Sequence, residues 1–221
     1  MNDVGAVARI ARRHLAPVLD RSGNILYSGA TTLRPGSIYL LGLNPGGDPH
    51  HHRRQTLRRV LRNLPSKHDN EYLDKTWDGQ RTKGTSVLQR RVQWLAKKLG
   101  HDLRKTCASN LIFVRSTDAQ NCGYPELARL CWPVHQTILS IVRPRLVIAF
   151  GNSSISPYAF LRSVLGDDSR ERTFPAGHAN WRCRAFRAAN GMWVVGLPHL
   201  SRYAVNRHAE VAKWLRPMAS A

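Results

Sequence analysis

Apolar positions along the chain follow two patterns, one typical of helices and the other of buried strands. Helical spacing predicts helices over residues 3–19, 57–64, 86–99, 125–142 and about 205–215. Continuous apolar runs predict strands over residues 37–41, 108–114, 145–151, 181–188 and 192–197. Asn190-Gly191 predicts a hairpin between the last two strands. Asn152, Ser153 and Ser154 suit the start of a further helix, and an irregular connection covers residues 166–180.

Strands that alternate with helices are typical of an α/β protein with a parallel sheet. A chain of 221 residues is most simply one domain, which spans residues 1–221. Residues 50–85 interrupt the pattern, because they form a polar, basic region rich in helix breakers. His50, His51 and His52 do not share one face of a helix or strand, so we interpret them as a solvated basic loop rather than a metal site.

The first strand leads into the sequence LLGLNPGGDP, at residues 40–49, whose composition indicates a loop that approaches a ligand closely. Gly42, Gly46 and Gly47 permit close backbone approach, and Pro45 biases Asn44 toward an extended conformation. Open α/β sheets bind ligands at the carboxyl ends of their strands, where an amide can hold a water molecule or a polar substrate atom. An ordinary turn between strand and loop is the alternative interpretation.

Two further polar side chains belong to predicted strands or to the loops after them. Asn110 stands at the start of the strand over 108–114, where it either bonds nearby backbone or presents its amide to a ligand. His199 follows the strand over 192–197. We expect Asn44 and His199 to face each other across the carboxyl edge of one parallel sheet.

The charge balance indicates a polyanionic partner. The chain has 34 Lys and Arg against 14 Asp and Glu, a net charge of +20, and most of the cations are arginine. Such a charge is typical of nucleic-acid binding, and the arginine fork suits phosphate. A generally basic protein without such a partner is the alternative. Because no apolar run reaches the roughly 18 residues of a membrane span, and no apolar signal core follows Asp3, we predict a soluble, intracellular protein.

The four cysteines show no metal-binding spacing. Cys107, Cys122, Cys131 and Cys183 form neither a C-x-x-C pair nor a zinc pattern with histidine. In a reducing compartment they are expected to be free thiols, a residue type that is commonly buried as a small apolar group. We therefore predict no structural metal.

Four segments, in order, resemble motifs of the uracil-DNA glycosylase superfamily. Gly42-Leu43-Asn44-Pro45-Gly46 is similar to the G-x-N-P-G motif of its mismatch-specific and single-strand-selective branches. Asn110 resembles a strand asparagine that contacts the flipped pyrimidine. Residues 143–151 (RPRLVIAFG) are similar to a proline, strand and glycine signature, and Pro198-His199-Leu200-Ser201 resembles the terminal H-P-S motif. The match spans roughly residues 37–215, although residues 50–85 align with no known motif.

This resemblance implies a three-layer α/β/α sandwich with a central, mostly parallel sheet and a role for each motif residue. Asn44 would position the attacking water and His199 would hydrogen-bond the base O2, which makes these two the catalytic residues. The implied base-binding residues are Gly42, Leu43 and Asn110, with Tyr72 and Trp77 as aromatics that either stack on the base or pack as a lid. The implied DNA contacts are Gly46, Gly47 and Ser201 at phosphates and Arg202 in the duplex.

Two alternatives and two departures accompany this assignment. Asp48 is a rival general base or a turn former, and Ser201 is a phosphate ligand or a helix cap. Leu200 stands where the family usually has proline, which puts the rigidity of the His199 loop in question. Cys131 resembles one ligand of the iron–sulfur branches, but Val114 occupies another ligand position. We therefore predict no iron–sulfur cluster and no other cofactor.

The sequence thus predicts a monomeric DNA glycosylase that flips and excises uracil or a related damaged pyrimidine, leaving an abasic site. Its DNA substrate would place it in the cytoplasm, at the nucleoid or in a nucleus. Two other functions remain open. The scaffold could serve as a catalytically silent nucleic-acid-binding module, or the glycine-rich loop could bind the phosphate of a free nucleotide that the protein hydrolyses.

Overall fold

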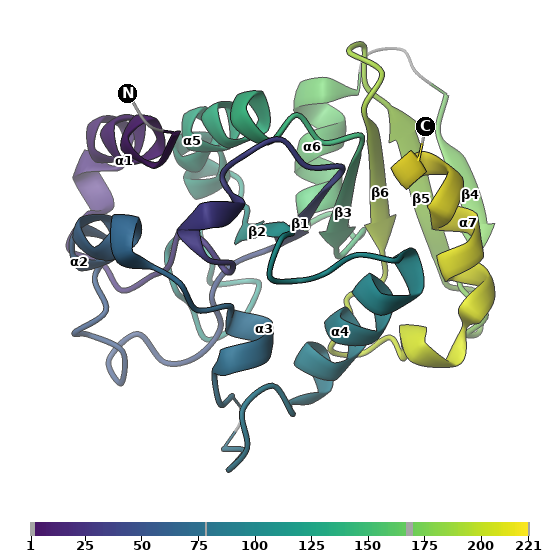
Figure 1. Ribbon diagram of the computed structural model, residues 1–221, viewed down its shortest axis with the longest axis horizontal. Coiled ribbons are helices and arrows are strands. Elements are labelled where there is room, and N and C mark those ends of the chain that lie inside the picture. Colours follow the sequence, from purple (N-terminus) through teal and green to yellow (C-terminus); the bar gives the residue numbers. More distant parts are fainter. Residues whose placement is uncertain (1–2, 78, 167–169, 221) are drawn as a thin grey trace.

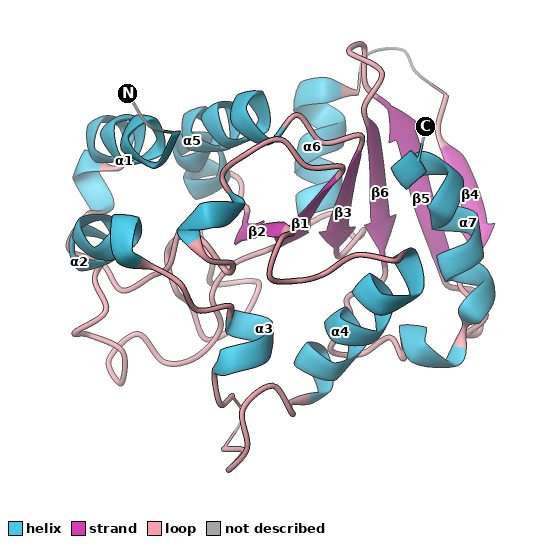
Figure 2. Ribbon diagram, viewed as in Figure 1, coloured by secondary structure: helices cyan, strands magenta, loops and turns pink. Residues whose placement is uncertain are grey.

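A mixed six-stranded sheet with helices on both faces organises the computed structural model, which describes residues 3–77, 79–166 and 170–220 (Figure 1). The strand order is β2-β1-β3-β6-β5-β4. The first four of these strands run parallel, and β5 and β4 add an antiparallel edge (Figure 2). In chain order the strands are β1 (Ile38–Gly42), β2 (Cys107–Asn110), β3 (Leu146–Phe150), β4 (Arg172–Pro175), β5 (Arg182–Arg187) and β6 (Trp193–Leu197). The predicted α/β class and mostly parallel sheet are confirmed.

The helices divide between the two faces of the sheet. In chain order they are α1 (Asp3–His14), α2 (Leu57–Asn63), α3 (Glu71–Asp74), α4 (Val87–Leu99), α5 (Glu126–Val142), α6 (Pro157–Leu165) and α7 (Ala209–Ser220). Short 3₁₀ helices cover Ala16–Val18, Ala30–Thr32, Leu64–Ser66 and Val205–Arg207. Helices α1, α5 and α6 pack in one apolar cluster and α4 and α7 in the other. The chain therefore has three layers.

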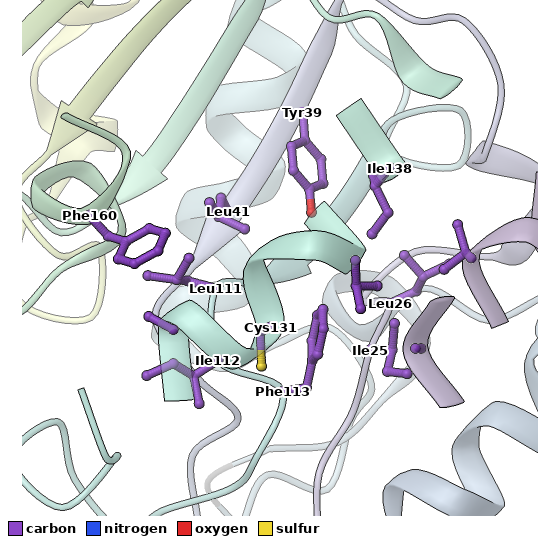
Figure 3. Close-up of a cluster of buried hydrophobic side chains, with 14 of the residues drawn as sticks. Ile25, Leu26, Tyr39, Leu41, Leu111, Ile112, Phe113, Cys131, Ile138 and Phe160 are labelled. Atoms are coloured by element: carbon purple, nitrogen blue, oxygen red, sulfur yellow. The ribbon is translucent and has the colours of Figure 1, made fainter. Parts of the chain in front are cut away.

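Alternation along β1 explains why both faces of the sheet are covered. Tyr39 and Leu41 belong to the cluster under α5, and Ile38 and Leu40 to the cluster under α4. Figure 3 shows Tyr39 and Leu41 on the side of β1 where Ile138 of α5 packs. Because successive side chains of a strand point to opposite faces, a fully apolar strand needs a helix on each side. Each such side chain contributes about 1.5–3 kcal/mol by leaving water.

A buried histidine ties α5 to the sheet. His135 is 1% exposed, its Nδ1 lies 3.0 Å from the Tyr39 hydroxyl, and its Nε2 lies 2.9 Å from the Leu111 carbonyl oxygen. Because a carbonyl only accepts, Nε2 carries the proton and Nδ1 accepts from Tyr39. Burial lowers the pKa of His135 to about 4, so the ring is neutral in the folded protein.

Several predicted elements are confirmed near their expected bounds. Helix α4 begins after Ser86, whose side chain forms a capping box with Gln89, and ends at Leu99, just before Gly100 with its φ of 77°. Helix α2, helix α5 and strand β3 also lie where the apolar pattern places them. The predicted hairpin is present, because β5 and β6 are antiparallel neighbours on either side of Asn190-Gly191.

Other predictions were wrong in extent. The first helix ends at His14 rather than residue 19, and a 3₁₀ helix containing Pro17 follows it. The last helix begins at Ala209 and continues to Ser220. The helix expected at Asn152–Ser154 starts after Ser156, whose hydroxyl accepts from the Ala159 N–H. Edge strand β4 and helix α3 were missed in segments expected to be irregular.

The strand over 108–114 is the correction that matters most for the site. Strand β2 covers only Cys107–Asn110, so Asn110 is its last residue and not near its start. Leu111 and Ile112 instead continue as buried backbone that donates to the carbonyls of Gly42 and Leu43. Asn110 therefore stands at the carboxyl edge of the sheet, directly beside Gly42 of β1.

Three features that the composition raised can be described in the structure. No helix among the described residues is long and apolar enough to cross a membrane. All four cysteines are buried free thiols, as expected for this residue type. Within the same ranges, His, Cys, Asp and Glu side chains form no group of three arranged to hold a metal ion, and the histidines at 50–52 lie in a turn.

Candidate active site

A cavity of about 940 Å³ opens at the carboxyl edge of the parallel strands. Gly42, Asn110, Phe150 and His199 bring the ends of β1, β2, β3 and β6 to its lining. The opposite wall comes from residues 67–77 and from the first turn of α4. In Figure 1 the arrowheads of β3 and β6 point toward α3 and α4. The cavity thus has the position and size expected of a ligand site in an open α/β sheet.

A second hollow of about 810 Å³ lies at the opposite edge of the sheet, against Arg143, Met192 and Trp193. It contains none of the polar side chains that follow the parallel strands. We therefore place the candidate active site in the first cavity, which contains them.

Asn44 enters the cavity with its amide orientation determined by its neighbours. Its Nδ2 donates to the Pro45 carbonyl oxygen at 2.9 Å and to the Ser116 hydroxyl at 2.8 Å. The Ser116 proton is already used, since that hydroxyl donates to the Asp118 carbonyl at 2.6 Å. Both partners of Nδ2 are therefore acceptors, and Oδ1 keeps its lone pairs. No donor among the described residues bonds Oδ1, so it can accept a hydrogen bond from a water molecule in the cavity.

Asn110 brings an unpaired donor to the same cavity. The residue is 4% exposed, and its Nδ2 has no hydrogen-bond partner in the described part of the chain. The amide lies close enough to the Tyr27 hydroxyl to lower that pKa slightly against the larger raising effect of burial, but no hydrogen bond of acceptable geometry joins them. A buried unpaired donor costs about 1–3 kcal/mol. A ligand acceptor would remove that cost.

Gly42 is required beside Asn110. A Cβ at position 42 would lie 2.0 Å from Asn110 Oδ1, far inside van der Waals contact. The register of the parallel ladder pairs these two residues, so the asparagine side chain lies over the bare backbone of β1. The first glycine of the G-x-N-P-G sequence therefore makes room for the amide of another strand.

His199 lines the cavity as a ring whose Nδ1 is held by Ser201. The Ser201 N–H lies 3.2 Å from His199 Nδ1, and the Ser201 hydroxyl lies 2.7 Å from the same atom. Because a backbone N–H only donates, Nδ1 accepts, and the proton of the neutral ring sits on Nε2. Surrounding protein lowers the pKa of His199, and the Arg202 charge lowers it further. His199 is exposed as a whole residue, although protein packs around its ring, and it lines the cavity.

The two predicted aromatic residues both line the cavity, but they differ in exposure. Tyr72 is 2% exposed and packs in the second apolar cluster, which fits the packing alternative rather than an exposed stacking face. Its ring lies 5.6 Å from that of Trp77 and 5.8 Å from that of Tyr27, and all three residues line the cavity. Phe150 completes this aromatic wall at 6.4 Å from Tyr72. Trp77 remains partly exposed.

A buried arginine fixes the glycine loop. Arg115 is 9% exposed, and its guanidinium donates to the Gly46 carbonyl, to Gln55 Oε1 at 3.1 Å and to the Ser22 hydroxyl at 3.3 Å. Burial lowers its pKa. Gly46 and Gly47 both line the cavity, and Gly47 has a φ of 100° that favours glycine. The backbone of the loop is therefore held still at the cavity mouth.

A charged cluster on the opposite wall was not anticipated. Asp69 pairs with Lys67 at 2.8 Å and with Lys75 at 2.5 Å, and these two lysines hold the pKa of Asp69 at about 2. Glu71 accepts from Asn24 Nδ2 at 3.0 Å and lies 3.4 Å from Lys67. The four charged residues fall in the region 50–85, which matched no motif. The alternation of acidic residues and lysines is the only feature of the sequence that indicates such a cluster.

The remaining candidates divide between the cavity and the surface. Leu43 and Ser201 line the cavity, and Ser201 orients His199 instead of capping the last helix. Asp48 accepts from the His50 N–H at 2.8 Å and lies 3.5 Å from His51. The carboxylate thus stabilises the exposed turn. Asp48 is not among the described residues that line the cavity. Arg202 is exposed beside His199.

No family model matches the sequence, and a search among curated proteins finds no matching protein.

Proposed function

We propose that this protein hydrolyses the N-glycosidic bond of uracil, or of a related damaged pyrimidine, in DNA. One observation carries the proposal. A fixed amide acceptor at Asn44, an unpaired amide donor at Asn110 and a neutral imidazole donor at His199 line one cavity at the carboxyl edge of the sheet. The sequence motifs that resemble uracil-DNA glycosylases supply the same three residues.

Each of these groups suits one step of the reaction. Asn44 Oδ1 would accept a hydrogen bond from water and direct it at C1′ of the sugar, where positive charge develops. His199 Nε2–H would donate to O2 of the base, where negative charge accumulates as the bond breaks. One preorganised donor of this kind is worth about 3–4 kcal/mol of transition-state stabilisation. The water's proton would leave to solvent or to the departing base, because an amide is a poor base.

Asn110 is suited to read the edge of the base. Its free Nδ2 would donate to a pyrimidine carbonyl, and its Oδ1 would accept from the ring N–H. Reading the Watson–Crick edge in this way requires a base that has left the duplex, because the partner base occupies that edge in a pair. Binding would satisfy a donor that no described residue bonds, so part of the cost of flipping is offset within the cavity.

The aromatic wall of the cavity and the net positive charge of the chain both favour binding of a flipped nucleotide. Partly exposed Trp77 offers a face for stacking, which is worth about 1–3 kcal/mol per base. The net charge of +20 supplies the attraction to phosphates that unstacking a nucleotide requires.

A gel assay with a uracil-containing oligonucleotide, followed by alkali, tests the proposal. Strand scission at the uracil by the purified chain is the expected result, and a thymine oligonucleotide of the same sequence is the control. DNA binding without scission would favour the silent module. Turnover of free nucleosides or nucleotides, with intact DNA neither bound nor cut, would favour the third function.

The assigned roles have their own test. Asn44→Ala and His199→Ala should each reduce the single-turnover rate at saturating enzyme by about 10²-fold or more, with DNA affinity changed far less. Asp48→Ala is the matched control, because this carboxylate lies in the exposed turn after the same loop. Equal losses of rate and affinity in the first two variants would show that the roles are wrong.

A further inference from the structure

The peptide group between Leu200 and Ser201 connects His199 to a charged side chain on another element. Its N–H end donates to His199 Nδ1 at 3.2 Å. Its C=O end accepts from Arg91 Nη1 at 2.7 Å, and the same nitrogen lies 2.9 Å from the Ser201 carbonyl oxygen. Arg91 belongs to the first half of α4, the helix whose first turn lines the cavity opposite the strand ends.

The planarity of this peptide makes the connection directional. Among the described residues only the Tyr124-Pro125 bond is cis, so the peptide between Leu200 and Ser201 is trans. In a trans peptide the N–H and C=O bonds point in opposite directions within one rigid plane. A guanidinium that fixes the oxygen therefore fixes the direction of the N–H toward His199. Its charge also polarises the peptide and strengthens that donor.

Arg91 supplies a restraint that the loop sequence lacks. Leu200 replaces the proline expected at this position, so its φ is not fixed by a ring. The Leu200 side chain is fully buried in the second apolar cluster, which anchors one side of the residue. The two carbonyl bonds from Arg91 anchor the backbone. No carboxylate pairs with Arg91 within the described ranges, so these carbonyls are its principal partners.

We propose that Arg91 is a positioning residue that holds His199, through the peptide between Leu200 and Ser201, with Nε2–H directed at the leaving base. The significance of this role for catalysis rests on the glycosylase function proposed above. The orientation of the histidine itself does not depend on that function.

Arg91→Ala, Arg91→Lys and Arg207→Ala test the kinetic consequence. Arg207 is an exposed arginine whose charge acts on Arg91, so its removal controls for the loss of one cation near the loop. In single-turnover excision at saturating enzyme we expect Arg91→Ala to be slower by about 10²-fold, the cost of a misplacement of roughly 1 Å. The Lys variant should lose less. Arg207→Ala should keep the wild-type rate constant.

Two further measurements separate positioning from folding and from DNA affinity. Millimolar guanidinium should restore part of the Arg91→Ala rate, because the free cation can occupy the vacated site, and it should not change the Arg207→Ala rate. Binding of a non-cleavable duplex should weaken similarly in the Arg91 and Arg207 variants. A thermal unfolding curve defines the temperature at which every variant is folded for the assay.

The tautomer of His199 provides a readout that does not require activity. In ¹⁵N-labelled protein, imidazole nitrogen shifts should show the proton on Nε2 in the wild type and in Arg207→Ala. They should show a mixture of tautomers in Arg91→Ala. An unchanged tautomer in Arg91→Ala overturns the proposal, as does an unchanged single-turnover rate. If the wild type excises nothing while the tautomer still shifts, the proposed function fails and the positioning role stands.

Discussion

At the scale of single residues, the buried amide of Asn110 is expected to lower the stability of the protein without ligand and to contribute a hydrogen bond when a base binds. Its Nδ2 is buried without a partner among the described residues. Asn110→Ala removes this unpaired donor, so we expect the free energy of unfolding to stay level or rise by up to about 1–3 kcal/mol while excision falls. Chemical denaturation and the single-turnover assay measure the two effects. A variant that is both less stable and less active would instead indicate a structural role.

The neighbouring residue provides the matched control for this prediction. Ser109 is also buried, but its hydroxyl donates to the Ile25 carbonyl. Ser109→Ala should therefore lower the free energy of unfolding by about 1 kcal/mol and leave the excision rate unchanged. Opposite effects from adjacent residues of one strand would distinguish a binding group from a packing group.

At the scale of elements, the β1–β2 pair predicts unequal effects of alanine in the glycine-rich sequence. A Cβ at Gly42 meets Asn110 Oδ1 at 2.0 Å, whereas a Cβ at Gly46 meets nothing within 4 Å. Gly42→Ala should displace the amide and reduce the single-turnover rate by about 10²-fold, and Gly46→Ala should change that rate little. Equal rates in the two variants would show that the contact between strands does not position Asn110.

The same strand pair shows what the sequence could and could not predict. The apolar runs indicated parallel strands, and the motifs indicated that Asn44, Asn110 and His199 belong to one site. The end of β2 was placed four residues too late, because the apolar residues 111–114 leave the ladder. Their backbone bonds instead to Gly42, Leu43 and Asn24. The wall made by residues 67–77 could not be predicted, because short helices and ion pairs there follow tertiary contacts rather than a period.

The contact between α5 and β1 predicts a pH dependence of stability. The pKa of His135 is about 4 in the folded protein and near 6.5 when unfolded. Between pH 4 and 6.5 the unfolded chain binds one more proton at this histidine than the folded protein does. The free energy of unfolding therefore has its full value above pH 6.5 and decreases by about 3 kcal/mol as the pH falls to 4. Denaturation at several pH values measures this slope.

His135→Gln supplies the control for that slope. Glutamine does not titrate, so the variant should be less stable at pH 7 and should lose less stability between pH 6.5 and 4 than the wild type does. Tyr39→Phe, which deprives Nδ1 of its donor, should cost about 1–3 kcal/mol at pH 7. An identical pH slope in His135→Gln and wild type would show that other groups cause the acid sensitivity.

At the scale of the whole molecule, the charge of +20 and the position of the cavity make separable contributions to DNA binding. Affinity should fall linearly with the logarithm of salt concentration, with a slope set by the number of phosphates contacted. Arginines that contact phosphate should each change that slope by about 1.

Arg202 is exposed beside the cavity, whereas Arg143 lies at the opposite edge of the sheet. Arg202→Asn should therefore lower the slope by about 1, and Arg143→Asn, which suits the φ of 48° at that position, should leave it unchanged. Fluorescence anisotropy with a labelled duplex from 50 to 200 mM salt, on the order of the range in which such binding is sensitive, measures both slopes. If the two variants lower the slope equally, the DNA is not centred on the carboxyl edge of the sheet. In that case the cavity is not where the flipped base binds.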